Sequence, residues 1–412
     1  MDGENKKKKF FTLACSAVLF FAAVTPGRSA GLEARKKVER ISVPLKLSRN
    51  VWNTLLLLPF FVVISQAETD FPILNGPYLG QKRPGPTPEI FAPGIVSLGF
   101  HEHNIAISAD GKEIFFVAAS SDFSRYLIMT TKLKNGAWTM PEVAPFSGGR
   151  NDGAPAFSPD GRRLYFSSRR PRTAGGIPAD DFDIWYVERK DGSWTDPVNL
   201  GGPVNTEKNE ANPSVMSDGT IFFQRIEKLG TLNWDIYVSS PSSGTHGVPE
   251  KLPAPVNTFA NEAGPFIAAD GSYLLFQSNR AGGHGVMDLY AAYRTKSGGW
   301  SEPVNLGEKV NSRYSDWGPV VSPDGKYLFF GSFRNVQPIV SGSRDYFESM
   351  ISLLGTPSPG KGTLYWVEAK VIDALRPKGE NAELDNALDR IILERDRRFG
   401  EFPEFKRRKI CF

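Results

Sequence analysis

The chain has 412 residues, 40% of them hydrophobic and 23% charged, a composition that excludes wholesale disorder and allows one large domain or two ordinary ones. Its 40 Gly, 31 Pro, 29 Phe, 12 Tyr and 8 Trp are typical of many tight turns and half-buried strands. The net charge of +4 is uneven: residues 1–67 hold 11 Lys/Arg against 4 Asp/Glu, so the remainder carries −3. A mildly acidic body argues against a nucleic-acid partner, which needs clustered positive charge.

Two apolar runs, residues 10–24 and 51–65, precede this body, and each follows basic residues. Each run is short for a bilayer span of about 20 residues but suits the apolar core of an export signal. The second ends Ser65-Gln66-Ala67, with small residues where a signal peptidase needs them, so we assign residues 1–67 to export, with the better signal in 46–67. Two interpretations stay open: the true start lies near residue 45, or the first run is an uncleaved membrane anchor. Both predict an extracytoplasmic body, periplasmic or secreted, after a linker at 68–84.

Five Asp-Gly pairs recur along the body, each just before an apolar, strand-like run. They are Asp110-Gly111, Asp160-Gly161, Asp218-Gly219, Asp270-Gly271 and Asp324-Gly325, spaced 50, 58, 52 and 54 residues apart. Asp-Gly between two apolar runs predicts a β-hairpin, because Gly supplies the positive φ that the tight turn requires. A third strand follows each hairpin, as at 184–187, and in most repeats a fourth, as at 194–198, whose Pro fits an edge strand. Four antiparallel strands in about 50 residues make one propeller blade.

The fifth repeat stops after its third strand, because residues 372–375 have a helical pattern. Residues 87–93 match the fourth strand of the first repeat, residues 140–145, yet they precede that repeat. We therefore predict that residues 87–93 lie beside residues 364–367, as the outer strand of the last blade, and close the ring. The predicted fold is all-β, a single propeller over residues 85–375 with five four-stranded blades. A sixth, degenerate blade within residues 335–362 stays open as an alternative.

Three recurring motifs are the Ser-Pro-Asp-Gly hairpins at 158–161 and 322–325, the Asp-Ile-Trp strand at 183–185 and the Trp-Thr-Asp-Pro-Val-Asn segment at 194–199. Together they resemble the WD-repeat-like propeller repeats of the TolB family. The resemblance covers roughly residues 85–372 and does not include the N-terminal domain of TolB. It implies a propeller fold and a bacterial protein that is secreted, periplasmic or attached to the cell surface and binds something.

An acidic residue stands just before every innermost strand, one per repeat. The five are Glu102, Asp152, Glu210, Glu262 and Asp316, and Asn209 and Asn261 directly precede two of them. With the strands of a blade lettered a to d outward from the axis, these residues fall on the face that carries the d–a and b–c connections. Fivefold repetition predicts a ring of carboxylates there, suited to a cation or to a cationic or sugar ligand. The structural alternative is that each acid accepts backbone N–H bonds within its own connection.

Arg170, Arg280 and Arg334 end strand b of three repeats. We expect the first two to pair with Asp183 and Asp288 across the b–c hairpin. No acid stands at the matching position for Arg334, so we predict that it lacks a partner and contacts a ligand.

Two b–c connections are long, residues 335–362 and, to a lesser degree, 171–181. Long excursions from a regular scaffold often carry function. The larger contains the aromatic and charged segment Arg344-Asp345-Tyr346-Phe347, and we take Tyr346 as a candidate ligand contact. The alternative is a loop folded down on the ring.

His101-Glu102-His103 has the residue types of a zinc site, but the chain has four His and no second His–carboxylate cluster. We expect a solvated turn there and neither metal nor cofactor. The chain has no Gly-x-Ser-x-Gly elbow and no Gly-rich phosphate loop between a strand and a helix, so we assign no catalytic residue.

Residues 376–412 form a charged segment in which Leu384, Leu388, Ile391 and Ile392 have helical spacing and residues 406–409 are basic. We predict a partly helical tail on the ring, with a partner-binding or membrane-surface tail as the alternative.

These patterns predict a non-catalytic, monomeric binding propeller that recognises a protein, peptide or glycan of the cell envelope on the face with the d–a and b–c connections. The alternative is a carbohydrate-active hydrolase or lyase that uses two ring carboxylates as acid and base. A third hypothesis is a structural piece of a larger surface assembly.

Overall fold

The computed structural model describes residues 71–149, 151–173, 175–227, 233–334, 346, 350–352, 354–355 and 361–377. All of these belong to the second of two compact units, Gln66–Phe412. The predicted export region 1–67 and residues 378–412 of the predicted tail lie outside the described residues.

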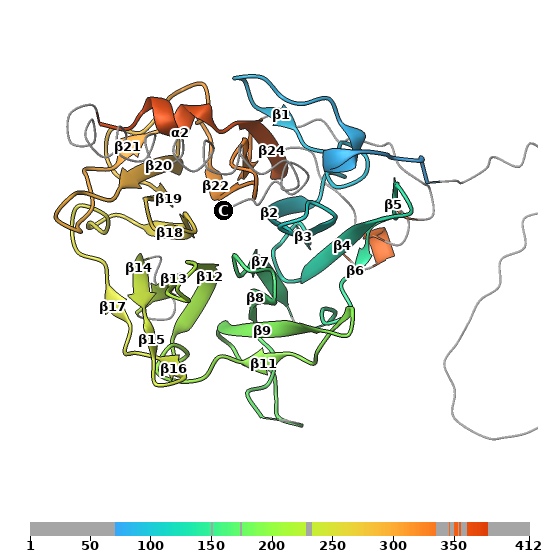
Figure 1. Cartoon of the computed structure of the whole chain (residues 1–412), viewed down its shortest axis with the longest axis horizontal. Helices are drawn as coiled ribbons and strands as arrows, with labels where there is room; N and C mark the ends of the chain where they lie inside the picture. Colours follow the sequence, from blue (N-terminus) through green and yellow to red (C-terminus); the bar gives the residue numbers. More distant parts are fainter. Residues whose placement is uncertain are drawn as a thin grey trace, which may run out of the picture. The chain divides into compact units, whose positions relative to one another are not determined.

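The described chain forms five four-stranded antiparallel blades arranged around a centre (Figure 1), which confirms the predicted propeller and its blade number. We number the blades 1 to 5 in chain order. The innermost strands a are β2 (His101–Ile107), β7 (Asp152–Phe157), β12 (Asn209–Val215), β18 (Glu262–Ile267) and β22 (Asp316–Val321). Strands b are β3 (Glu113–Ala119), β8 (Arg163–Ser168), β13 (Ile221–Ile226), β19 (Tyr273–Ser278) and β23 (Tyr327–Ser332).

The two outer strands differ in length. Strands c are β4 (Tyr126–Lys134), β9 (Asp183–Lys190), β14 (Trp234–Ser239), β20 (Asp288–Tyr293) and β24 (Thr363–Glu368). Strands d have two residues each: β6 (Glu142–Val143), β11 (Val198–Asn199), β17 (Glu250–Lys251), β21 (Val304–Asn305) and β1 (Glu89–Ile90). Short ribbons extend some c–d connections: β5 (Ala137–Trp138), β10 (Ser193–Trp194), β15 (Pro241–Ser242) and β16 (Thr245–His246). Short outer strands leave little unpaired edge for other chains to join.

Each a–b turn is built by its Ser-x-Asp-Gly or related sequence. In blade 2, the hydroxyl of Ser158 donates to Asp160 at 2.6 Å and accepts the N–H of Arg163 at 2.9 Å. Gly161 has a φ of 69°, a conformation that other residues adopt only with strain, and its N–H donates to the carbonyl of Ser158 at 2.8 Å. The repeated tetrad is therefore a turn signal and needs no functional explanation.

The ring closes as predicted. Glu89 and Ile90 of β1 pair with Trp366 and Tyr365 of β24, and the N–H of Phe91 donates to the carbonyl of Leu364 at 2.9 Å. The first strand of the fold thus completes the last blade, and in Figure 1 β1 lies beside β24.

Apolar clusters fill the spaces between blades, and the cluster at the closure includes residues that precede β1. Leu79, in the 3-10 helix η1 (Pro77–Gly80), is buried in this cluster, so residues of the predicted linker pack on the ring. After the last strand, α2 (Lys370–Ala374) confirms the helical pattern and buries Ile372. In the described residues, no helix has the length and apolar character needed to cross a bilayer.

Candidate functional site

We call the face with the d–a and b–c connections the loop face. Glu102, Asp152, Glu210, Glu262 and Asp316 begin there, at the start of the innermost strands, and each residue is at most 1% exposed. Carboxylates this deeply buried need hydrogen-bond donors or cations around them.

The donors come first from each acid's own d–a connection. In three blades a Thr or Ser four residues earlier donates both its N–H and its hydroxyl to the acid. The pairs are Thr206 with Glu210, Thr258 with Glu262 and Ser312 with Asp316, at donor–acceptor distances from 2.6 to 3.1 Å. In blade 2, Asp152 accepts from the Ser147 hydroxyl at 3.1 Å. This is the geometry that the structural alternative expected.

In four blades an arginine completes the unit by pairing with the acid. The ion pairs are Arg170–Asp152 (2.6 Å), Arg225–Glu210 (2.9 Å), Arg280–Glu262 (3.1 Å) and Arg334–Asp316 (2.8 Å). Each guanidinium also lies over two aromatic rings of strands b and c, as Arg334 does over Phe330 and Tyr365, both at 5.0 Å. The repeated acid–arginine–aromatic unit explains why these residues recur in the sequence.

The predicted partners of these arginines are wrong. Arg170 and Arg280 pair with the acid of strand a in their own blade, not with Asp183 or Asp288, and Arg334 is not without a partner. Asp183 and Asp288 are equally buried, at 1% exposed, but other groups satisfy them: Asp288 accepts the N–H of Gly285 at 2.9 Å and the side-chain amide of Asn305 at 2.8 Å. Asp183 is satisfied instead by Arg172 at 2.7 Å.

Blade 1 departs from this pattern, because Ala118 stands opposite Glu102 where blade 3 has Arg225. One oxygen of Glu102 accepts the N–H groups of Leu98 and Phe100, at 2.9 and 3.0 Å, and the other accepts the hydroxyl of Thr363 at 3.1 Å. Burial without a cation raises the pKa of Glu102 to about 7.

Tyr346 is 4% exposed and packs in the closure cluster with Met350 and Leu354. Burial raises the pKa of its hydroxyl, and the negative charge of Glu102 adds to the effect. The described residues of the fifth-blade insertion are therefore folded onto the ring. A ligand contact by Tyr346 stays a prediction, and it requires this segment to move.

In four of the five blades the side chain of the residue before the acid links neighbouring blades. The side-chain oxygens of Asn151, Asn209 and Asn261 accept the N–H of Tyr126, Phe182 and Trp234 in the preceding blade, at 3.1, 2.9 and 3.2 Å. At the ring closure His101 takes this position, and its Nδ1 accepts the N–H of Gly362 at 3.1 Å. Asn209 and Asn261 are thus interblade links in this structure.

A second interblade link fails at the closure. Each innermost strand has a bulge two residues after the acid, and the N–H groups of Asn212, Gly264 and Gly318 donate there to side chains of the preceding blade. At the junction of blades 5 and 1 the matching residue is Gly331, which has no side chain to accept. Trp317 fills the space, so close that a Cβ on Gly331 would lie 2.7 Å from the indole.

Six rings form a closed circuit at this junction, which we call the aromatic circuit. Its members, in order of contact, are Phe333, Trp317, His103, Tyr126, Phe123 and His101. Successive ring centroids lie 4.4, 6.2, 6.3, 6.2 and 3.9 Å apart, and His101 returns to Phe333 at 5.5 Å. Phe182 of blade 2 extends it, 6.0 Å from Tyr126.

The circuit is partly open to solvent on the loop face. Phe123 is 39% exposed, whereas Trp317, Phe333 and Tyr126 are half-buried. Phe123 has a φ of 56°, which an aromatic residue adopts only with strain. The turn thus holds this ring over His101 at some conformational cost.

The expected solvated turn at His101-Glu102-His103 is wrong, because these residues lie in β2 and all three are buried. Burial lowers the pKa of both histidines to about 4, so both are neutral near pH 7. Within the described residues, no group of three or more His, Cys, Asp or Glu is arranged to hold a metal ion.

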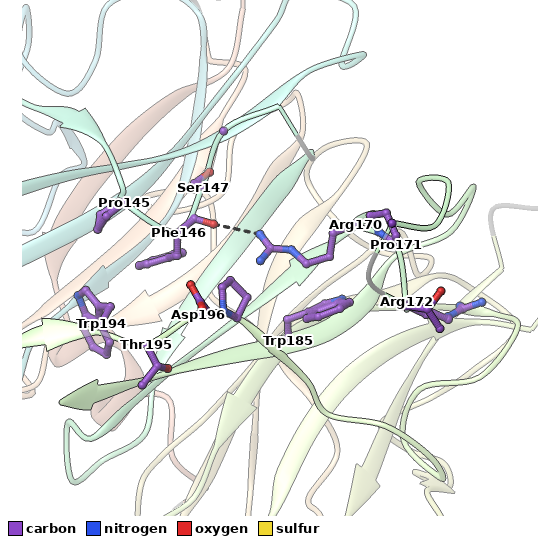
Figure 2. Close-up of a pocket in the computed structure, with 14 residues that line it drawn as sticks. Pro145, Phe146, Ser147, Arg170, Pro171, Arg172, Trp185, Trp194, Thr195 and Asp196 are labelled. Atoms are coloured by element: carbon purple, nitrogen blue, oxygen red, sulfur yellow. Dashed lines mark hydrogen bonds between the residues drawn. The ribbon is translucent and has the colours of Figure 1, made fainter.

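A separate cleft of about 570 Å³ lies between blades 1 and 2 (Figure 2). Trp185, Trp194 and Phe146 line it together with Arg170, and Pro171 and Arg172 come from the second-blade insertion. The Arg170 guanidinium donates to the Phe146 carbonyl at 3.1 Å, the bond drawn in Figure 2. The hydrogen-bonding groups of Arg170 are therefore used within the acid–arginine unit, so this arginine has a structural role in the cleft wall.

No family model matches the chain, and no curated protein matches it by sequence. Several solved structures are similar. TolB from Acinetobacter baumannii is 17% identical, with 66% of this chain and 57% of that chain covered and a TM-score of 0.38. An α-L-arabinofuranosidase from Lactobacillus brevis is 15% identical, with 66% and 91% covered and a TM-score of 0.40. An endo-arabinase from Bacteroides thetaiotaomicron is 17% identical, with 61% and 94% covered and a TM-score of 0.39. Likeness at this level bears on neither ligand nor reaction.

The sequence did not predict the aromatic circuit, because its members have no common period. The available signal was the misfit between repeats: where blades 2, 3 and 4 have Gly153, Ala211 and Ala263, blades 1 and 5 have His103 and Trp317. A large ring at a position where the fold needs only a small residue indicates another role.

Proposed function

We propose that this propeller is an extracytoplasmic binding module whose ligand, a glycan or a peptide, rests on the aromatic circuit of the loop face. The observation that supports this most is the closed circuit of six rings with Phe123 partly exposed at its rim. Rigid aromatic side chains bind with little loss of conformational freedom and dominate many recognition surfaces.

The position of the circuit in the ring adds support. Four blades share the acid–arginine unit, and three junctions share the bulge link, so these features serve the fold. The circuit lies at the junction of blades 5 and 1, where the bulge link is missing, and blade 1 also lacks the acid–arginine unit. A binding site on a repeat scaffold is expected at such a departure, because identical repeats would otherwise offer identical surfaces.

The predicted alternative, a hydrolase or lyase, needs two ring carboxylates that reach a substrate. Each ring acid is at most 1% exposed, and each already accepts several hydrogen bonds or an ion pair. We therefore favour binding over catalysis. Release of shortened glycans by the wild-type protein would favour the alternative.

The test is binding of the full chain to a glycan and peptide array. We expect the double variant Phe123→Ala, Phe333→Ala to lose at least tenfold in affinity for any ligand found, with unchanged circular dichroism. Phe259→Ala is the control, because Phe259 is fully exposed and outside the circuit. Wild-type affinity in the double variant would contradict the proposal.

A further inference from the structure

Arg169 differs from the arginine beside it. The Arg170 guanidinium pairs with buried Asp152, whereas that of Arg169 lies 4.5 Å over the Phe182 ring at the edge of the aromatic circuit. Its Nε is buried and has no acceptor among the described residues, and none of their ion pairs includes it. Arg169 is thus a cation held in place by stacking, without a carboxylate to balance it.

A second cation lies on the other side of the circuit. The ammonium of Lys361 donates to the Ser121 carbonyl at 2.9 Å, and its charge helps to lower the pKa of His101, after burial. A carbonyl is a neutral acceptor, and no ion pair among the residues that the structure describes includes Lys361.

The carboxylate of Asp122, which lies beside Phe123 in the same turn, accepts its hydrogen bonds from that turn. Asp122 accepts the hydroxyls of Ser120 and Ser124 at 2.6 and 2.8 Å and the N–H of Ser124 at 3.1 Å. It pairs with neither Arg169 nor Lys361. Its donors are neutral, so Asp122 remains a fully exposed, solvent-screened charge, and the circuit combines flat apolar faces with two cations and one carboxylate at its border.

We propose that the ligand is an anionic saccharide whose sugar units carry carboxylates, such as a chain of uronic acids. The rings would contact the C–H faces of successive sugars, and the guanidinium of Arg169 would bind one carboxylate through two parallel hydrogen bonds. Lys361 would bind a second as a point charge. A uronic acid carries a flat face and a carboxylate on one rigid unit, whereas an acidic peptide carries its carboxylates on flexible stems without such a face. This inference rests on the proposed function and specifies its ligand.

The test is calorimetric titration of the full chain with an oligomer of galacturonic acid, its carboxyl-reduced counterpart and poly-glutamate. We expect the acidic oligomer to bind at least tenfold more tightly than the other two, and more weakly as salt rises. Arg169→Gln and Lys361→Gln should each weaken it several-fold. The control is Arg162→Gln, which removes the same charge from an a–b turn on the opposite face, where the side chain is 86% exposed.

Each other outcome contradicts the inference. Equal binding of the reduced oligomer would mean that the carboxylates do not matter, and preference for poly-glutamate would indicate an acidic peptide. Equal loss in Arg162→Gln would indicate nonspecific charge attraction, and no binding of any probe would remove the saccharide. In all four cases a ligand that depends on Phe123 and Phe333 in the array would leave the proposed function standing.

Discussion

Glu210 and Arg225 form the most deeply buried of the ring's ion pairs, with side chains 0% and 8% exposed. The geometry assigns the carboxylate a structural role, and stability measurements can separate that role from ligand binding. We expect Glu210→Gln to lower the free energy of unfolding by about 3 kcal/mol or more, because it leaves Arg225 buried without a counter-charge. Urea denaturation measures this. Glu188→Gln in the exposed pair with Arg163 is the control, with an expected loss under about 1 kcal/mol. Equal small losses in both variants would contradict the structural assignment.

Glu102 differs from Glu210 because no arginine of the described residues pairs with it, so we expect its protonation to change stability with pH. The folded state keeps its proton up to about pH 7, whereas the unfolded chain releases it near pH 4.5. The unfolded chain thus holds fewer protons between these values, and this group's contribution to stability falls as pH rises from 4.5 to 7. Glu102→Gln should remove up to about 3 kcal/mol of that fall. Unfolding at pH 5 and pH 8 in both proteins measures the difference, and a constant gap between them would contradict the raised pKa.

At the scale of elements, β1 is the strand on which closure depends. Phe91 follows it, is fully buried, and lies 5.1 and 5.2 Å from the rings of Phe329 and Trp366. We expect Phe91→Ala to cost about 3 to 5 kcal/mol. Amide hydrogen exchange should speed up most in β24, because its outer neighbour β1 is no longer held in place by the Phe91 side chain. An equal increase of exchange in all blades would indicate that β1 does not stabilise the last blade in particular.

The elements were more predictable than their side-chain partners. Asp-Gly turns and alternating apolar strands are local signals, and the match of residues 87–93 to a fourth strand was enough to place β1 beside β24. The partner of Arg334 is Asp316, 18 residues earlier on another strand, and that choice follows from burial, which spacing alone does not reveal. The aromatic circuit likewise depends on loop conformations, such as the positive φ of Phe123, that have no repeat in the sequence.

For the whole molecule, His101 makes ring closure sensitive to acid. Its Nδ1 must be unprotonated to accept the Gly362 N–H, and burial lowers its pKa to about 4, against 6.5 in the unfolded chain. The unfolded chain binds the proton first, so stability is lost as pH falls from 6.5 to 4. Asn occupies the same position in three other blades, so His101→Asn should keep the link and reduce acid destabilisation by up to about 3 kcal/mol. Thermal unfolding of both proteins between pH 4 and 7 measures this. An equal loss of stability at low pH in the wild type and in His101→Asn would contradict it.

Because the outermost strand of the last blade is the first one translated, the ribosome must deliver almost the whole propeller before β1 can find its partner. Ser97, just after β1, contacts the carbonyl of Leu364 across 267 residues of chain. Blades 1 to 4 can each form from contiguous chain, but the fifth has to wait for a contact of very long sequence separation, which slows folding. A nascent chain would therefore form an open arc of finished blades that closes only after β24, Thr363–Glu368, has been synthesised.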